Sequence, residues 1–313
     1  MIIDPHYHLM AEEYFPDEIW TMLAHQMTGH VTGDRAAQAS ADQFRAEVIP
    51  RFWDPDGERL LAKMSDCGID QSVLLADDFG VRFGGLPAPL QEQNKAIADL
   101  AACHPGRLIP FCSVDPRRPD TLKILSTCIE ELGMRGIGEL HPDTGWEPSG
   151  PEAYRMLSRV EHWDVPILIH TGLFFPPLHS KYDLPMYLDD VCADFPDLKV
   201  IAAHAGRTLW WREVAHLAGI HPNLYAELAG FQTLAVRKRP EFRAMLREFI
   251  DICGADKILW ATDDPVYDET GIKTSAYLDL FRHLPDDTSD GITFTQAEIS
   301  AILGENAARI LKL

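Results

Sequence analysis

Two histidines separated by one residue stand near the start of the chain, in the segment Ile2-Ile3-Asp4-Pro5-His6-Tyr7-His8. The apolar start of this segment predicts a strand, and in a strand residues i and i+2 point to the same face. His6 and His8 would therefore present two imidazoles side by side, and imidazole is a common metal ligand near neutral pH. A His-x-His pair also fits an N-terminal loop without a function, so the rest of the chain must decide.

Four more side chains of the metal-ligating type follow apolar runs. Glu139 stands near the end of one run, and His170, His204 and Asp263 end three others. In a parallel barrel the carboxyl ends of the strands open onto one face, where active sites are built. With the first histidine pair, six potential ligands would converge from five strands. Three imidazoles and a carboxylate suit a borderline divalent ion such as zinc, manganese or iron.

Such an ion favours a particular chemistry. It lowers the pKa of bound water toward neutrality, so that hydroxide can attack a carbonyl or a comparable electrophile. An aspartate beside that water can orient it, take its proton and pass the proton to the leaving group. In this hypothesis Asp263 shuttles the proton, and the metal together with His204 stabilises the developing oxyanion.

The elements that must position these side chains alternate along the chain. After the first strand, apolar runs predict seven more strands at 71–76, 108–114, 134–140, 165–170, 198–204, 223–228 and 258–263. Helical spacing predicts helices at 57–67, 91–103, 120–132, 152–163, 186–195 and 241–253, and a closing helix at 299–311. Eight strands that alternate with helices predict a single α/β domain over residues 1–313, folded as a (β/α)8 TIM barrel. An open doubly wound sheet fits less well because no glycine-rich phosphate loop follows the first strand.

The stretch from Met10 to about Asp56 interrupts this alternation. It is rich in aromatic residues, such as Trp20 and Phe44, and has no clean strand period. An insertion directly after a candidate metal-binding strand could be a lid or pocket wall. It could equally be a peripheral helical subdomain that packs its own aromatic side chains.

Composition limits the partners and the compartment. The chain has 313 residues, 46% of them hydrophobic and 24% charged, with a formal net charge of −20. This charge argues against a nucleic acid or an anionic membrane as the main partner. The six cysteines lack paired spacing, and we see neither a secretory signal nor an apolar run that could span a bilayer. We expect a cytoplasmic protein with a small-molecule substrate.

The residues resemble the metal-dependent amidohydrolase superfamily. Within it the chain looks like the amidohydrolase-2 branch, which holds aminocarboxymuconate-semialdehyde decarboxylase and many lactone and amide hydrolases. The resemblance covers nearly the whole chain, and the motifs that carry it are Asp4-Pro5-His6-Tyr7-His8, Leu168-Ile169-His170-Thr171-Gly172, Ala203-His204-Ala205-Gly206, Ala261-Thr262-Asp263-Asp264-Pro265 and Gly304-Glu305-Asn306-Ala307.

The resemblance implies roles for these residues. His6, His8, His170 and Asp263 would hold one metal, most simply zinc with manganese as the alternative. His204 would be a second ligand or a catalytic group, and Asp4 would support the site from behind.

The fourth strand decides how many ions the resemblance implies. Parts of the superfamily place a carboxylated lysine there to bridge two metals, and others place a glutamate. If Glu139 bridges, the site is binuclear, with His170 and His204 on the second metal; if Glu139 turns away, the site holds one ion.

Several residues have alternative interpretations. Asp264 could be the ligand in place of Asp263, and Glu139 could instead pair with Arg135. Arg207 could bind a substrate carboxylate through two hydrogen bonds, or it could form a surface ion pair.

Other residues have weaker claims to a role. His141 could face the pocket or cap its loop, and Trp210 and Trp211 fit helix packing better than substrate stacking. We interpret five further histidines as structural or exposed: His162, His179, His216, His221 and His283.

Three classes of function remain for comparison. The first is a metal-dependent hydrolase of a small lactone, amide or ester-like substrate, which a bridging Glu139 would favour. The second is a non-oxidative metal-dependent decarboxylase of a small carboxylated aromatic or enoic acid. The third is a binding or structural protein whose convergent ligands are idle. Barrels of this kind are often dimers, so a homodimer is one option, and the sequence leaves the oligomeric state open.

Overall fold

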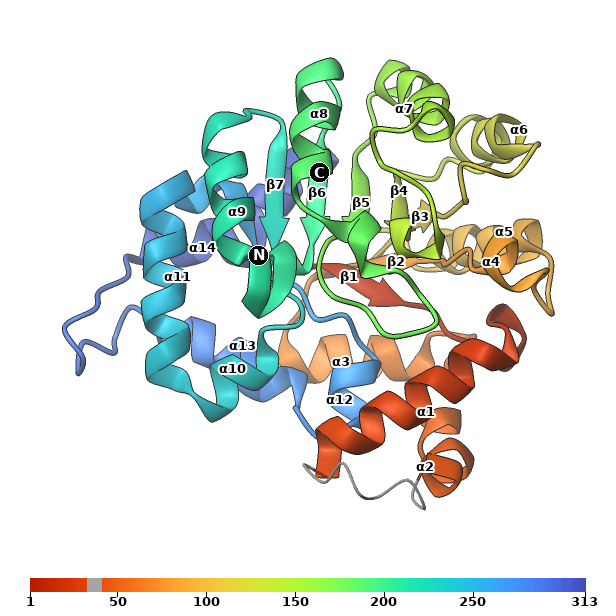
Figure 1. The fold of residues 1–313 in the computed structure, drawn as a ribbon. Coiled ribbons are helices and arrows are strands. Elements are labelled where there is room, and N and C mark those ends of the chain that lie inside the picture. The colour runs from red at the N-terminus through yellow and green to blue at the C-terminus, as the bar shows by residue number, and fades with distance from the viewer. Residues whose placement is uncertain (33–40) are drawn as a thin grey trace.

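The computed structural model describes residues 1–32 and 41–313, and its eight parallel strands lie in sequence order around a barrel (Figure 1). The strands are β1 (Ile3–His8), β2 (Gln71–Leu75), β3 (Leu108–Cys112), β4 (Gly136–Leu140), β5 (Ile167–His170), β6 (Val200–Ala203), β7 (Leu224–Glu227) and β8 (Ile258–Leu259). A parallel bridge between Tyr7 and Asp264 joins the last strand segment to the first. The (β/α)8 barrel predicted from the sequence is therefore confirmed.

Helices connect the strands on the outside of the barrel. The longer ones are α1 (Asp17–Thr32), α3 (Glu58–Cys67), α5 (Leu90–Cys103), α7 (Pro151–Trp163), α8 (Met186–Asp194), α9 (Arg207–Ile220), α11 (Arg239–Cys253) and α13 (Thr274–Arg282). The shorter ones are α2 (Ala41–Glu47), α4 (Gly80–Phe83), α6 (Thr121–Ser126), α10 (Gln232–Arg237), α12 (Val266–Glu269), α14 (Gln296–Ser300) and α15 (Asn306–Leu311). Single turns add η1 (Glu12–Tyr14), η3 (Ile49–Arg51), η4 (Thr127–Glu131), η5 (Pro142–Thr144), η6 (Ser180–Asp183), η7 (His204–Gly206), η8 (Ala255–Lys257) and η9 (Ala301–Glu305).

Helix α7 shows how local sequence forms these elements. Pro151 opens it at a position where a missing N–H costs nothing, and Asp164 ends it in the left-handed conformation. Its buried residues Ala153, Met156, Leu157 and Val160 follow the spacing of one helical face. This face packs the helix against the strands.

The interior of the barrel is apolar at the end opposite the polar strand ends. Alternate residues of the strands, such as Val73 and Leu75, form one buried cluster with Ala307, Ile310 and Leu311 of α15. Alternation places these strand residues on the inner face of the sheet. Helix α15 therefore closes the amino-terminal end, and the carboxyl-terminal end is left for the polar side chains.

Some predicted boundaries differ from the observed ones. Strand β8 stops at Leu259 because the N–H of Trp260 donates to the carbonyl of Ile302 (2.8 Å), outside the sheet. His204 follows β6 and begins the turn η7. The helix predicted at 120–132 divides into α6 and the wider turn η4.

The insertion at 10–56 contains α1 and α2, which lie together on one side of the barrel (Figure 1), and residues 33–40 of it lie outside the described part. Its aromatic side chains form a cluster of their own, as one interpretation expected. The same cluster includes Phe79, Leu178 and Val266, which belong to the segments that follow β2, β5 and β8. The insertion therefore rests on three of the segments at the carboxyl ends of the strands.

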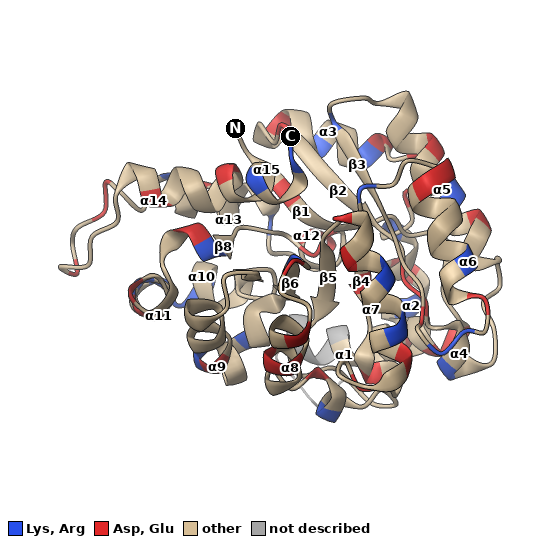
Figure 2. Ribbon diagram, turned by 90° about the horizontal axis from the view of Figure 1, so that it is seen from above, with Lys and Arg blue, Asp and Glu red and all other residues tan. Residues whose placement is uncertain are grey.

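The surface charge is dispersed. Figure 2 shows acidic and basic residues interspersed along outer helices such as α5 and α7. All six cysteines are free thiols. Among the helices of the described residues, none combines the length and apolar character needed to cross a bilayer.

We predict that Asn306→Ala destabilises the fold. The buried amide of Asn306 donates to the carbonyls of Ala255 and Ile258 (2.8 Å each) and so ties α15 to the start of β8. Unpaired buried carbonyls cost about 1–3 kcal/mol, and chemical denaturation should show a loss of this size. The exposed Gln296→Ala is the control, and equal stability of the two variants would contradict the prediction.

Candidate metal centre

Six side chains predicted from the sequence meet at the carboxyl ends of the strands, and we call them the central cluster. Its members are His6, His8, Glu139, His170, His204 and Asp263. All are buried except Asp263, whose side chain is 14% exposed. Overlapping subsets of three have ligand atoms within 4.8 Å of one another.

Glu139 lies in the middle of the central cluster. Its Oε2 is 3.4 Å from Nε2 of His6 and 3.5 Å from Nε2 of His8. Its Oε1 is 3.0 Å from Nδ1 of His170 and 3.3 Å from Nε2 of His204. Each carboxylate oxygen thus faces a different histidine pair. Arg135 instead donates to the carbonyl of Leu311 (2.7 Å), so it is not the partner of Glu139.

Asp263 faces the central cluster and Asp264 does not. Oδ1 of Asp263 is 3.2 Å from Nε2 of His8, and Oδ2 is 3.9 Å from Nδ1 of His204. Asp264 accepts from Nζ of Lys63 at 3.1 Å and is bound by the Thr274 hydroxyl. Asp264 therefore serves a hydrogen-bond network outside the cluster.

The rings of His6 and His8 are oriented to bind a cation. Nδ1 of His6 lies 3.2 Å from Glu227 Oε1, and Nδ1 of His8 lies 2.8 Å from Asp77 Oδ2. A carboxylate accepts, so each Nδ1 carries the hydrogen and each neutral ring turns a lone pair outward at Nε2. The two Nε2 atoms are only 2.9 Å apart, and facing lone pairs require a proton or a metal ion beside them.

The pKa shifts of His170 and His6 agree with a cluster that binds a cation. Burial lowers the pKa of His170 to about 4, so this ring is a neutral ligand at physiological pH. Burial also opposes a charge on His6, but the negative charges of Glu139 and Glu227 outweigh it and raise the pKa of His6 to about 10. Without a metal ion, these carboxylates stabilise a proton on His6 in place of the ion.

Sequence reasoning missed the carboxylates behind the histidines. Asp77 and Glu227 are buried and fix the ring orientations of His8 and His6, as carboxylates do for metal-binding histidines. Each stands at or just after the end of a strand, so the rule that found Glu139 would also have found them. Asp4 lies behind the cluster, where its carboxylate accepts from the Thr262 hydroxyl (2.6 Å).

The turn after β6 positions two candidate residues. Four successive residues have positive φ: His204 (61°), Ala205 (44°), Gly206 (76°) and Arg207 (52°). Three of them are not glycine, so the turn is strained, and strain of this kind is concentrated at functional sites. The carboxylate of Glu227 accepts from the backbone N–H of His204 and holds the turn in place.

Arg207 is partly buried and lacks a counter-ion. Within residues 1–32 and 41–313, no carboxylate forms an ion pair with it, and its Nε has no hydrogen-bond partner. Its side chain lies close to Gly172, where an added Cβ would come within 3.0 Å of Arg207 Cγ. The surface ion pair considered for this arginine is therefore not seen.

His141 lies beside the central cluster, and the other residues considered from the sequence lie away from it. His141 is buried and its ring stacks on His170, with centroids 5.6 Å apart. Trp211 packs on Phe249 of α11, as helix packing predicted. The other five histidines considered lie outside every potential ligand group of the described residues: His162, His179, His216, His221 and His283.

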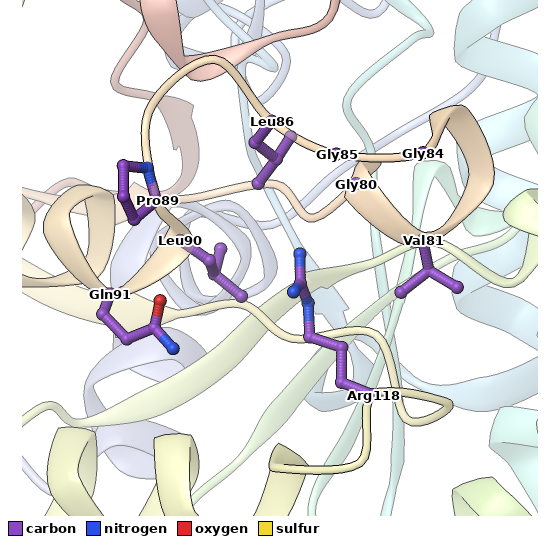
Figure 3. Close-up of a pocket in the computed structure, with 9 residues that line it drawn as sticks. All are labelled: Gly80, Val81, Gly84, Gly85, Leu86, Pro89, Leu90, Gln91 and Arg118. Carbon is purple, nitrogen blue, oxygen red and sulfur yellow. The ribbon is translucent and has the colours of Figure 1, made fainter.

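A pocket of about 390 Å³ lies elsewhere, between α4 and the start of α5. Figure 3 shows Arg118 pointing into it. The guanidinium of Arg118 already binds both oxygens of Asp78 (2.5 and 2.7 Å), and none of the lining residues belongs to the central cluster. This pocket is separate from the candidate metal centre.

We predict that Mn²⁺ binding releases protons and weakens as the pH falls. The pKa of His6 and of His8 is raised above the usual value, so at lower pH protons compete more strongly with the ion. Calorimetric titrations in two buffers of different ionisation enthalpy, at pH 6 and pH 8, measure both effects. A dissociation constant that is independent of pH, with no proton release, would contradict this prediction.

Comparison with known proteins identifies the family to which the chain belongs. The family model described as Amidohydrolase matches residues 3–313. Among curated proteins, Protein fluG of Emericella nidulans is 27% identical over 113 residues, which are 36% of this chain and 13% of that protein. The chain thus spans a small part of that relative.

Two solved structures resemble the fold over nearly all of both chains. An uncharacterised TIM-barrel protein from Bordetella bronchiseptica has 22% identity and a TM-score of 0.68, covering 99% of this chain and 98% of that one. A dihydroxybenzoic acid decarboxylase from Polaromonas, solved with manganese and an inhibitor, has 18% identity and a TM-score of 0.66, covering 100% and 97%. At this identity the likeness shows the fold.

Proposed function

The chain belongs to the amidohydrolase family, and we propose that it is a metal-dependent hydrolase acting on a C–O or C–N bond of a small lactone, amide or ester-like substrate. The observation that carries this proposal is the carboxylate of Glu139, whose two oxygens face different histidine pairs. A carboxylate in this position can bridge two ions. Zinc or manganese suits the imidazole and carboxylate ligands.

The central cluster divides into two ligand sets around Glu139. His6, His8 and Asp263 would hold one ion, and His170 and His204 the other. A divalent ion supplies Lewis-acid polarisation of the substrate and activation of water. The surrounding carboxylates and the burial of the rings hold these ligands in place before the ion arrives.

In this proposal Asp263 and His204 carry out the proton transfers. Oδ1 of Asp263 faces the first histidine pair, which leaves Oδ2 to accept the proton of the attacking water and return it to the leaving group. His204 turns Nε2 to Glu139, so its Nδ1, which has no partner, is free to donate to the developing oxyanion.

Arg207 would bind an anionic group of the substrate. It follows His204 by three residues, and although burial opposes its charge, the neighbouring Tyr267 and then Asp263 raise the pKa of the arginine above its usual value. An unpaired guanidinium beside a reaction centre is suited to a carboxylate, which it binds through two hydrogen bonds.

The insertion at 10–56 would form a wall of the site. Phe79 and Phe174 contact the rings of His141 and His170, with centroids 4.5 and 4.9 Å apart, and both phenylalanines pack with the insertion's aromatic side chains. These aromatic rings exclude water from one side of the central cluster. The cytoplasmic location expected from the sequence stays a prediction, and a homodimer stays one option.

Non-oxidative decarboxylation is the second candidate. The structural resemblance to a manganese-containing dihydroxybenzoic acid decarboxylase supports it, and so does an arginine placed to bind a carboxylate. The same buried cluster could hold one ion and a carboxylated phenol or enoic acid. Fold likeness alone does not choose between the two reactions.

A substrate panel separates the two candidates. We expect the manganese- or zinc-loaded protein to hydrolyse lactones or amides that carry a carboxylate, and Asp263→Asn to lower kcat by about 10²- to 10⁴-fold at equal metal loading. Hydrolysis is followed by acid release and decarboxylation by CO₂ release. Turnover that yields CO₂ and no hydrolysis product would replace the first candidate with the second.

Arg207→Met should raise KM for carboxylated substrates by about 10- to 100-fold, because a charge-assisted hydrogen bond is lost. KM for a matched uncharged ester should change little. The control is Arg212→Met, which removes an exposed arginine of the same helix that pairs with Glu248. An equal loss on charged and uncharged substrates would contradict a role in binding the carboxylate.

A further inference from the structure

Tyr267 lies beside the central cluster with a phenol hydroxyl that has no partner. The residue belongs to α12, four positions after Asp263. Its backbone carbonyl accepts from the Thr270 hydroxyl (3.2 Å) and from the N–H of Ile272 (3.0 Å). The phenol hydroxyl, in contrast, forms no hydrogen bond with any of the described residues. The fold therefore uses the backbone of Tyr267 and leaves its hydroxyl available.

The hydroxyl of Tyr267 borders a gap left by the missing side chain of Gly230, which follows β7. A Cβ placed on Gly230 would lie 3.6 Å from Oη of Tyr267 and 3.8 Å from Cγ of Arg207. The same point is 3.6 Å from Nδ1 of His204. Side chains from the segments after β6 and β8 therefore meet at one point over Gly230, next to the central cluster.

This gap lies on the accessible side of the central cluster. Gly230, Tyr267 and Arg207 are each partly exposed. Of the six members of the central cluster, five are buried, and Asp263, with a side chain 14% exposed, is the one that solvent reaches. Asp263 stands only four positions before Tyr267 in the chain. A substrate that approaches Asp263 therefore passes the gap over Gly230.

Two groups at this gap are donors without an acceptor. The guanidinium of Arg207 has five N–H donors and no acceptor, and within the described residues its buried Nε has no hydrogen-bond partner. Burial raises the pKa of Tyr267, although the charge of Arg207 opposes the rise, so the phenol keeps its hydrogen and can donate it. A carboxylate would satisfy both donors, because it accepts hydrogen bonds at each of its two oxygens.

We propose that Tyr267 is a substrate-binding residue whose hydroxyl donates to the same substrate carboxylate that Arg207 binds, in the gap over Gly230. This inference rests on the function proposed above, which assigns an anionic group of the substrate to Arg207, and it adds a second donor on a separate segment. Two donors without an acceptor also select against an uncharged amide, whose NH₂ group would face them unpaired. Tyr267 thus contributes to specificity for carboxylated substrates.

The test is the affinity of the zinc-loaded protein for 4-fluorobenzoate, a carboxylate without a bond to hydrolyse, followed by fluorine NMR. We expect Tyr267→Phe to raise Kd about 10-fold, because a hydrogen bond to a charged group is lost. The control is Tyr154→Phe, which removes a hydroxyl that donates to Asp194 on the outer helices (2.6 Å) and should leave Kd unchanged. No binding by the wild type, or equal Kd values for Tyr267→Phe and wild type, would overturn the proposal.

The same substitution in an Arg207→Met background separates direct contact from an effect through the arginine. If the hydroxyl of Tyr267 contacts the carboxylate, Tyr267→Phe weakens the binding of 4-fluorobenzoate further in that background. No further weakening would mean that Tyr267 acts only by positioning Arg207. The affinity for uncharged 4-fluorobenzamide should be the same with and without the hydroxyl, and an equal loss for both probes would assign Tyr267 to packing.

Gly230→Ala tests the location of the subsite without removing a donor. The added methyl group would fill the gap between Tyr267 and Arg207, so we expect it to weaken the binding of 4-fluorobenzoate by about 10-fold or more. Gly106→Ala is the control for backbone strain, because Gly106 has a similar φ (76° against 88°) and open space around its Cβ position. Wild-type affinity in Gly230→Ala would place the carboxylate elsewhere.

Binding and turnover together separate this inference from the proposed function. If the wild type binds 4-fluorobenzoate through Tyr267 but hydrolyses none of the lactones and amides, the subsite stands and the hydrolase proposal fails. If the wild type hydrolyses carboxylated substrates while Tyr267→Phe changes neither their KM nor the Kd of 4-fluorobenzoate, the subsite fails and the proposed function stands.

Discussion

The structure depends on one buried carboxylate placed between two pairs of imidazoles. Glu139 turns one oxygen to His6 and His8 and the other to His170 and His204, at distances of 3.0 to 3.5 Å. In water-excluded surroundings these charges cannot be left uncompensated, so the cluster holds either protons or metal ions. Its acid–base properties and its affinity for divalent ions follow from the same constraint.

The barrel makes this arrangement rigid. The six ligands leave the carboxyl ends of five strands or the segments just after them, with His6 and His8 both on β1, and neighbouring strands are hydrogen-bonded in parallel. Behind the ligands, Glu227 bonds to the ring of His6 and to the turn that carries His204, while Asp77 joins His8 to His141. A change in the orientation of one ring therefore alters the hydrogen bonds of its neighbours. The ligand positions are set before any ion binds.

Most of the fold and the central cluster could be predicted from the sequence, because strand alternation and the placement of polar residues at strand ends are local patterns. Local pattern alone does not separate Asp263 from Asp264, since the choice depends on a backbone turn at Asp263 with a φ of 55°, and it was the family resemblance that favoured Asp263. Asp77 and Glu227 were not among the predicted site residues, because they orient the metal ligands and are not ligands themselves. The packing of 10–56 against three separate loops is a long-range contact that no local pattern encodes.

Anomalous X-ray scattering from crystals of the manganese-loaded protein would test the central claim most directly. We expect two peaks in the central cluster, one on each side of the Glu139 carboxylate, with His6 and His8 beside one and His170 and His204 beside the other. A single peak beside His6 and His8, with Glu139 turned away from it, would contradict the bridging role. No peak in the central cluster of a fully loaded protein would contradict a metal centre altogether.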